Sequence, residues 1–385
     1  MHLARMEFAA AVALLSLAAP ASAAAPRCAA SDEQLLAAIR DVHDRQRNVG
    51  VQSAIHLDGR LVFSGSVGLA DRDRRIPVSR TTRFPLASVT KAFTGVATLR
   101  AAASGRLNLD APIQTYVPEF PVKPELTITP RRLAANRTGI RHWGPERDAL
   151  FTRRFDRLSQ ILPLFAADPL LPNAGTEYQY SSYGYNLLGL AVERATGSEF
   201  TRYVARQILA PLRLSRTAFD DARRPVPDRA KLYSAYDLTS YAEIAPGSPL
   251  IEVPPRDYSH NMAGGNMSST AEDLVRFGAA LLRPGLLPER HWTMLYVRPE
   301  FAGGPSAMSF GFFAPEAGSE RRMSISGSNP GTQTGLIVYP ERRLAVAVLS
   351  NSWGFGSRSG EMVSDLPKRL ADLCAPVRPP AASAG

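Results

Sequence analysis

The alternation of hydrophobic and polar positions predicts helices near both ends of the chain and two hairpins between them. Residues 31–47 begin with Ser31 and Gln34 at a capping-box spacing and continue with helical periodicity. A closing helix is expected over residues 360–373. Apolar or alternating runs around tight polar turns predict strands at residues 49–56, 60–68, 333–339 and 344–349.

The segment between the hairpins is dominated by helical patterns. Helices are expected at residues 88–103, 129–135, 185–196 and 270–282, and residues 140–175 are expected to be largely helical and irregular. Residues 218–262 are rich in Pro, Asp, Tyr and Ser, as in long loops that form lids or binding walls. This order predicts an α+β fold in which the two hairpins join into one antiparallel sheet flanked by helices. The terminal helices cover one face, and a mostly helical inserted lobe, roughly residues 105–260, covers the other.

The first 23 residues are typical of a cleaved signal peptide. Arg5 precedes an apolar run over residues 8–19, and residues 21–23 (Ala-Ser-Ala) offer a small-residue cleavage site. The run is shorter than the roughly 20 residues that span a bilayer. We therefore expect an exported protein, periplasmic or secreted, without stable membrane insertion after cleavage. Residues 24–374 form one domain, and the Pro/Ala-rich residues 375–385 are expected to be disordered.

Composition and charge narrow the classes of function. The formal net charge is +10, but the arginines are spread along the chain without a nucleic-acid-binding motif, so no nucleic-acid partner is expected. Six scattered histidines and two cysteines show no metal-ligand spacing, so we expect neither a metal nor another cofactor. Cys28 and Cys374 lie at opposite ends of the mature chain, and the sequence leaves open whether they form a disulfide or stay free thiols.

The strongest candidate for chemistry is Ser88, three residues before Lys91 at the start of an apolar helix. At this spacing the two side chains share one helix face, and the positive end of the helix dipole favours a developing alkoxide on the serine. Burial lowers the pKa of an ammonium group, so Lys91 can act as a base. Only four of the 45 Lys and Arg residues are lysines, so a lysine is less often expected by chance three residues after Ser88. Alone, the pattern also fits a capping serine followed by an ordinary lysine.

Two further segments have structural explanations when each is taken alone. Residues 178–186 are rich in tyrosine and serine, as in core packing, and residues 324–331 are typical of a Gly/Ser turn. Together with residues 84–91, and in this order, they resemble the serine β-lactamase and penicillin-binding protein superfamily. The nearer branch is that of the β-lactamase-like serine hydrolases: class C β-lactamases, D-aminopeptidases, D,D-carboxypeptidases, esterases and LACTB-type proteases. The resemblance covers about residues 31–374, includes residues 128–133, 138–143, 180–189 and 262–274, and implies a β-lactamase/transpeptidase-like fold.

The resemblance also implies roles for particular residues. Ser88 matches the family's nucleophile, Lys91 the residue that activates it, and Tyr180 the tyrosine that relays protons between the nucleophile and the leaving group. An unperturbed tyrosine has a pKa of ~10, so Lys91 would have to lower that pKa, and the three groups would titrate as a unit. The backbone N–H groups of Ser88 and Ser328 correspond to the oxyanion hole. The matching substrate-binding positions are Ser182, Ser326 and Gly327.

Two positions depart from the family pattern. Ser182 replaces the asparagine of the Tyr-x-Asn element, and a serine has a shorter reach and no amide with which to hold a substrate amide. Ile325 replaces the lysine or histidine that opens the third element, and isoleucine cannot bind a carboxylate or relay a proton. The missing cation argues against β-lactams and D-Ala-D-Ala peptides, which carry a carboxylate. Esterases of the superfamily resemble this chain in relaxing the same element.

Three functions stay open on the sequence. The first is a secreted serine hydrolase that forms an acyl-enzyme on Ser88 with a small-molecule ester or a peptide-like amide. The second is a D,D-carboxypeptidase, D-aminopeptidase or β-lactamase that acts on cell-wall peptides or β-lactams. The third is a catalytically degenerate binding protein that uses the same cleft. A Ser-His-Asp hydrolase is disfavoured, because no G-x-S-x-G sequence is present.

Overall fold

The computed structural model describes residues 25–375, apart from residues 145, 222, 225, 317 and 357–359. The predicted signal peptide, residues 1–23, and residues 376–385 of the predicted tail lie outside the described residues. No helix within the described part of the chain is both long enough and apolar enough to cross a membrane.

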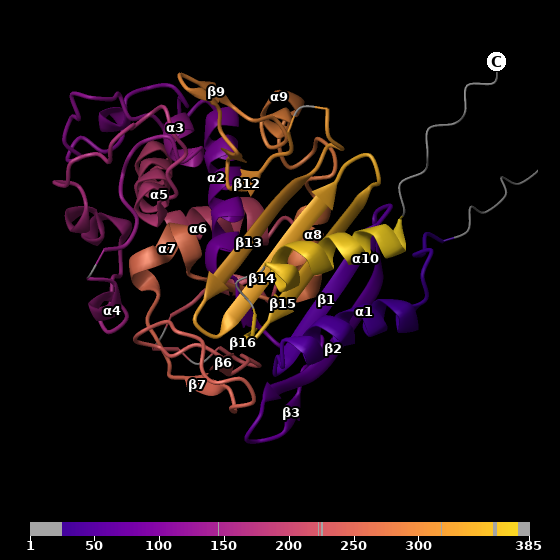
Figure 1. The fold of residues 1–385 in the computed structure, drawn as a ribbon. Helices are drawn as coiled ribbons and strands as arrows, with labels where there is room; N and C mark the ends of the chain where they lie inside the picture. The colour runs from indigo at the N-terminus through magenta and orange to yellow at the C-terminus, as the bar shows by residue number, and fades with distance from the viewer. Residues whose placement is uncertain are drawn as a thin grey trace, which may run out of the picture.

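The first and last hairpins of the chain share one antiparallel sheet, as predicted (Figure 1). Its eight strands run in the order β11-β12-β13-β14-β15-β1-β2-β3. The hairpins meet where β1 pairs with β15, in a register that runs from Val51 opposite Ser350 to Leu57 opposite Leu344. The strands are β1 Gly50–Leu57, β2 Arg60–Asp71, β3 Ile76–Pro77, β11 Met308–Ser309, β12 Phe312–Phe313, β13 Met323–Asn329, β14 Thr332–Tyr339 and β15 Leu344–Ser350.

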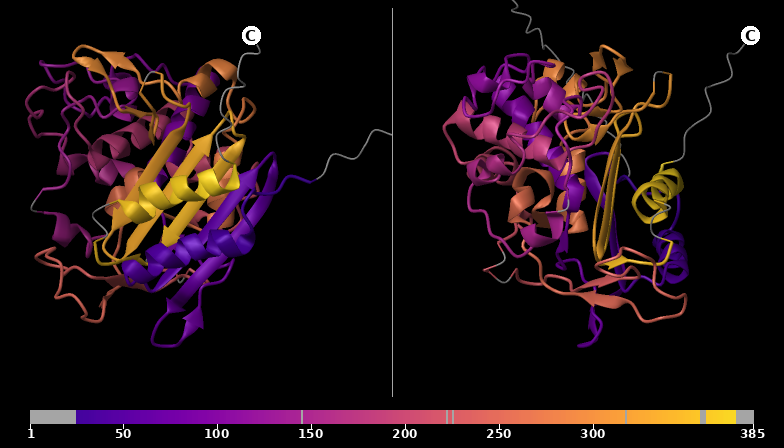
Figure 2. Two further views of the ribbon diagram at one scale, coloured as in Figure 1. Left: turned by 45° about the vertical axis from the view of Figure 1, so that its right-hand side comes forward. Right: turned by 60° about the vertical axis from the view of Figure 1, so that its left-hand side comes forward.

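The terminal helices, α1 (Asp32–Arg45) and α10 (Leu366–Cys374), cover one face of the sheet (Figure 2). Ser31 caps α1 in the predicted capping box with Gln34. Apolar side chains of both helices join those of β1, β14 and β15 in one buried cluster. A disulfide between Cys28 and Cys374 ties the two ends together, which resolves the alternative that the sequence left open.

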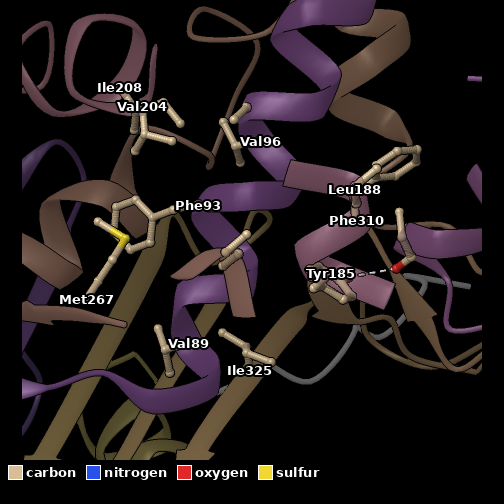
Figure 3. Close-up of a cluster of buried hydrophobic side chains, with 14 of the residues drawn as sticks. Val89, Phe93, Val96, Tyr185, Leu188, Val204, Ile208, Met267, Phe310 and Ile325 are labelled. Carbon is tan, nitrogen blue, oxygen red and sulfur yellow. Dashed lines mark hydrogen bonds between the residues drawn. The ribbon is translucent and has the colours of Figure 1, made fainter. Parts of the chain in front are cut away.

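The helical layer covers the opposite face of the sheet (Figure 2). Helix α2 (Thr90–Ala103) runs through its centre, and α8 (Ala271–Ala279) packs on β1 and β15. The rings of Phe93 and Phe277 stack between these two helices at 3.9 Å. Figure 3 shows part of the core around α2. The layer thus includes α2 and α8, which lie outside the range 105–260 predicted for the helical lobe. The other helices are α3 Pro130–Ala134, α4 Arg147–Leu150, α5 Ser182–Thr196, α6 Phe200–Val204, α7 Met262–Gly265 and α9 Glu289–Thr293.

Two middle segments differ from the predictions. The described residues of the segment 140–175, all but residue 145, contain one short α-helix and two 3-10 turns, because few of the apolar positions follow a helical period. Residues 218–262, predicted as a long loop, contribute short strands to two small three-stranded sheets. The remaining strands are β4 Phe84–Pro85, β5 Ala218–Phe219, β6 Leu232–Ser234, β7 Ile251–Val253, β8 Met267–Ser269, β9 Glu300–Phe301, β10 Gly304–Pro305 and β16 Ser352–Trp353.

Candidate active site

Ser88 lies in a tight turn between strand β4 and helix α2. The prediction started the helix at Ser88, but the structure places this residue in a 3-10 turn, Ala87–Val89, and α2 begins at Thr90. Ala87 has a φ of +45°, in the left-handed region that a non-glycine residue seldom occupies. Neighbouring strands hold the turn, since Leu86 N–H donates to Met267 O (2.7 Å) and the Thr334 hydroxyl donates to Leu86 O (2.8 Å). The serine is therefore fixed by its neighbours in a strained turn, as is common for reactive residues.

The structure brings three predicted catalytic residues together from two distant segments. The Ser88 Oγ lies 2.6 Å from the Tyr180 phenol oxygen, a distance at which either hydroxyl can donate. The Lys91 ammonium donates to Ser88 Oγ at 3.4 Å and lies 4.8 Å from the centre of the Tyr180 ring. A proton on any one of these groups can therefore reach another without a large movement.

Lys91 is fully buried, and its further contacts are to two neutral oxygens and to the ring of Tyr185, whose centre lies 5.5 Å from the ammonium. It donates to Ser182 Oγ at 2.9 Å and to the Gly264 carbonyl at 2.7 Å. Burial lowers the pKa of Lys91 below its ordinary value of 10.5, and the charge and hydrogen bond of Tyr180 oppose that shift. Ser182 thus contacts the predicted catalytic lysine although it departs from the family's asparagine.

Strand β13 brings the third predicted segment to the nucleophile. Its local composition is typical of a Gly/Ser turn, but residues 323–329 form a strand because they pair with β14 along their whole length. A Cβ atom on Gly327 would lie 2.3 Å from Leu86 O and 2.9 Å from Ser88 N, so only glycine fits this close approach. Ser326 is partly exposed and Ser328 is exposed on the same strand. Because β13 packs against the Ser88 turn at Gly327, the backbone of the next residue, the predicted oxyanion residue Ser328, follows directly after this close approach.

Ile325 points to the interior of the protein and not to solvent. Its side chain is 2% exposed and belongs to the main apolar core. Figure 3 shows it beside Val89, one residue after the nucleophile. A lysine or histidine at this position would put a second cation close to the Ser88 turn. Lys91 is the cation that contacts Ser88 and Tyr180 in the described part of the chain.

One side of the site is built from aromatic rings. The His142 ring meets the Tyr180 ring edge-on, with centroids 5.3 Å apart, and also packs on Trp143 at 4.9 Å. Trp143 in turn contacts the ring of the buried His260 at 5.1 Å. Trp143 and His142 are both partly exposed. These rings form an aromatic wall beside Tyr180.

Residue-by-residue prediction missed two groups that contact the catalytic residues. Gly264 supplies a carbonyl to Lys91, and His142 accepts a hydrogen bond from Ser182 N–H at 3.2 Å. Both lie in stretches, 262–274 and 138–143, that resemble the family, and this was the only signal that could have indicated them. Among the described residues, no three His, Cys, Asp or Glu side chains lie together in a way that could hold a metal ion.

Comparison with known proteins gives a family and a fold. The family model described as Beta-lactamase matches residues 35–362. Protein flp of Staphylococcus aureus (strain N315) is 28% identical over 320 residues, which cover 80% of this chain and 61% of that protein. The chain thus spans about three fifths of the length of this relative.

Solved structures support the same fold. The octameric penicillin-binding protein homologue from Pyrococcus abyssi is similar with a TM-score of 0.73 and 21% identity, over 89% of this chain and 76% of that one. EstCE1, described as a hydrolase with promiscuous acyltransferase activity, gives a TM-score of 0.70 and 22% identity, over 89% and 97%. At these identities the likeness is one of fold.

Proposed function

The chain belongs to the β-lactamase family, and we propose that it is a serine hydrolase that cleaves neutral or weakly polar esters through an acyl-enzyme on Ser88. The observation that carries this proposal is the contact of Ser88 Oγ with the Tyr180 hydroxyl at 2.6 Å and with Lys91 at 3.4 Å. An activated serine needs a proton acceptor within hydrogen-bond reach, and here two groups meet that condition.

In the acylation step, Ser88 Oγ attacks the carbonyl carbon of the substrate, and the carbonyl electron pair moves to its oxygen. The Ser88 proton passes through the Tyr180 hydroxyl to the leaving oxygen as the bond to that oxygen breaks. Lys91, whose pKa burial lowers, is the second group that can take the proton from Ser88. Backbone N–H groups of Ser88 and Ser328 are assigned to stabilise the oxyanion. Water then attacks the acyl-enzyme, gives its proton back along the same path, and releases the acid.

The substrate class follows from the lining of the site. Ile325 is buried and uncharged at the position where the family has a cation, which leaves no partner there for a substrate carboxylate. The aromatic wall formed by His142 and Trp143 suits an apolar acyl or leaving group. Both features favour esters without a carboxylate. EstCE1, a hydrolase with promiscuous acyltransferase activity, is similar in fold to this chain and carries out acyl transfer.

Hydrolysis of peptide-like amides is the second candidate, and one observation favours it. Strand β13 pairs with β14 on one edge, whereas the pairing of β12 with β13 involves only Ser324. The open edge beyond Ser324 offers backbone groups to an extended peptide.

The intact contacts among Ser88, Lys91 and Tyr180 argue against a degenerate binding protein.

We also propose that the protein works in an oxidising compartment outside the cytoplasm. The disulfide between Cys28 and Cys374 favours such a compartment, because cytosolic thiols are kept reduced. The predicted signal peptide gives the same answer from the sequence.

A panel of matched substrates tests the proposed reaction. We expect kcat/KM to be highest for neutral short-acyl and aryl-acyl esters, lower for the matching amides, and lowest for esters with a carboxylate beside the scissile bond. A preference for D-Ala-D-Ala peptides or β-lactams over neutral esters would overturn the ester assignment. Ser88→Ala must be inactive on every substrate that the parent enzyme cleaves.

A further inference from the structure

The phenol of Tyr180 depends on a short irregular segment for its position. Tyr180 belongs to no helix or strand, and α5 begins two residues later, at Ser182. Four hydrogen bonds join this segment to residues 136–142. They run from Gln179 N–H to Asn136 O (2.9 Å), Ser181 N–H to Asn136 Oδ1 (2.9 Å), the Ser181 hydroxyl to Arg141 O (2.8 Å) and Ser182 N–H to His142 Nδ1 (3.2 Å).

His142 contacts both the ring of Tyr180 and the backbone N–H at the start of α5. Its Nδ1 accepts from the backbone of Ser182, and its ring packs edge-on against the ring of Tyr180, at 5.3 Å and 78°. Ser182 is itself 2% exposed, and its hydroxyl accepts from the Lys91 ammonium at 2.9 Å. A change at His142 therefore acts on Tyr180 directly and on Lys91 through Ser182.

The Ser182 N–H is one of the amide groups that a helix leaves without an intrahelical partner at its first turn. Ser181 satisfies another of them, because its hydroxyl accepts from Gly184 N–H at 2.9 Å. Loss of the imidazole acceptor would leave the Ser182 amide buried and unpaired, which favours a shift of the start of the helix. Such a shift moves Tyr180 relative to Ser88, whose contact depends on a distance of 2.6 Å.

We infer that His142 is a positioning residue, which holds the start of α5 through its Nδ1 and thereby keeps the Tyr180 hydroxyl on Ser88. The inference rests on the proposed function, since it requires that Tyr180 relays protons for Ser88. His142 takes no proton in this account. Its Nδ1 acts as a fixed acceptor, and its ring acts as a side wall for the phenol.

Three substitutions separate the acceptor from the ring. His142→Asn puts a carboxamide oxygen three bonds from Cα, where Nδ1 now lies, and so can still accept from Ser182 N–H. His142→Gln carries the same amide one methylene farther along and cannot place its oxygen there without moving. His142→Phe keeps an aromatic ring against Tyr180 and removes the acceptor. The Asn and Gln variants are a matched pair in polarity.

The experiment measures kcat and KM on a neutral ester, the rate constant for labelling of Ser88 by a fluorophosphonate, and Tm, for the full mature protein. The Asn and Gln variants both lose the ring from the aromatic wall, but Asn alone keeps the acceptor, so we expect the Asn variant to keep a higher kcat and a higher labelling rate than the Gln variant. The Gln and Phe variants should lose about tenfold or more in kcat and in labelling rate relative to the parent enzyme. KM should rise in the Asn and Gln variants, which lose the ring, and change little in the Phe variant, which keeps one. Should the Phe variant fail to fold, the difference in kcat and labelling rate between the Asn and Gln variants still tests whether the acceptor positions Tyr180.

Two results would overturn the inference. One is equal activity and labelling in all three variants. The other is a fall in kcat and labelling rate in the Asn variant as large as that in the Gln variant, because the retained acceptor would then have no effect on catalysis. Failure of the proposed function has a different signature: Ser88→Ala would keep the esterase activity, or the parent enzyme would not be labelled at all.

Discussion

The hydroxyl oxygens of Ser88 and Tyr180 lie 2.6 Å apart although 92 positions separate the two residues in the sequence. Ser88 is held by a turn between strand β4 and helix α2, and Tyr180 by the residues that precede α5. Helices α2 and α5 pack on each other in the core, so the packing of the helical layer sets this distance. Lys91, three residues after Ser88, is buried in the core and donates from its ammonium group to Ser88 Oγ.

Replacement of Lys91 by methionine separates activity from stability. Lys91→Met fills the same buried space without a charge, so we expect kcat/KM to fall by about 10²- to 10⁴-fold. The free energy of unfolding should rise by about 1 kcal/mol, because the variant no longer buries an amine. Ester hydrolysis and urea denaturation measure the two effects. Retained activity would remove Lys91 from the mechanism.

The same residue predicts a pH dependence of stability. Burial holds the pKa of Lys91 below 10.5 in the folded protein, so between the lowered value and 10.5 the unfolded chain binds more protons than the folded one. The free energy of unfolding contributed by this group therefore rises as pH increases through that window. Denaturation curves at several alkaline pH values should show this slope in the parent protein and its loss in Lys91→Met. Identical slopes would mean that the ammonium is not desolvated.

A histidine at position 325 tests the account of substrate class. Ile325→His buries an imidazole beside Val89, so the free energy of unfolding should fall by about 1–3 kcal/mol. The ratio of kcat/KM for carboxylate-bearing over neutral esters should rise. Ile325→Val is the control, with a smaller loss of stability and an unchanged ratio. The same ratio in both variants would contradict the match of β13 with the family's third element.

The disulfide is expected to stabilise the layer formed by α1 and α10 without affecting the chemistry. A double variant, Cys28→Ser with Cys374→Ser, should lose about 2–4 kcal/mol of unfolding free energy. Its rate of Ser88 labelling at 25 °C should equal that of the parent protein. Urea denaturation with and without reductant checks the first statement, since reductant should affect only the parent. Equal stability of the two proteins would show that the bond is dispensable.

Periodicity and turn chemistry predicted the elements with strong local signals. These include the capped helix α1, both hairpins and the close of α5 at Gly197, which has a φ of +66°. Composition alone suggested a Gly/Ser turn at residues 324–331, and this was wrong. Residues 323–329 form a strand, because pairing with β14 overrides the local preference of Gly and Ser for turns. Residues 140–175, between α3 and α5, contain less helix than predicted. Tertiary contacts fix the conformation of this segment, and the periodicity of its sequence does not reveal them.

The site divides in a similar way. Ser88 and Lys91 carry a spacing that local chemistry can explain, whereas Tyr180 and Ser328 were found only through resemblance to a family. The Gly264 carbonyl has no side-chain signature, and a lone His142 is usually without chemistry, so neither could be assigned from the residues. Their roles depend on how α5 and α7 pack around Lys91.

The most direct test of the central claim is the intact mass of the purified protein after exposure to a serine-directed fluorophosphonate, with Ser88→Ala as the control. The account predicts a single adduct on the parent protein and none on the variant, with both proteins folded by circular dichroism. An adduct that persists in Ser88→Ala, or no adduct on the folded parent protein, would contradict the assignment of Ser88 as the activated nucleophile.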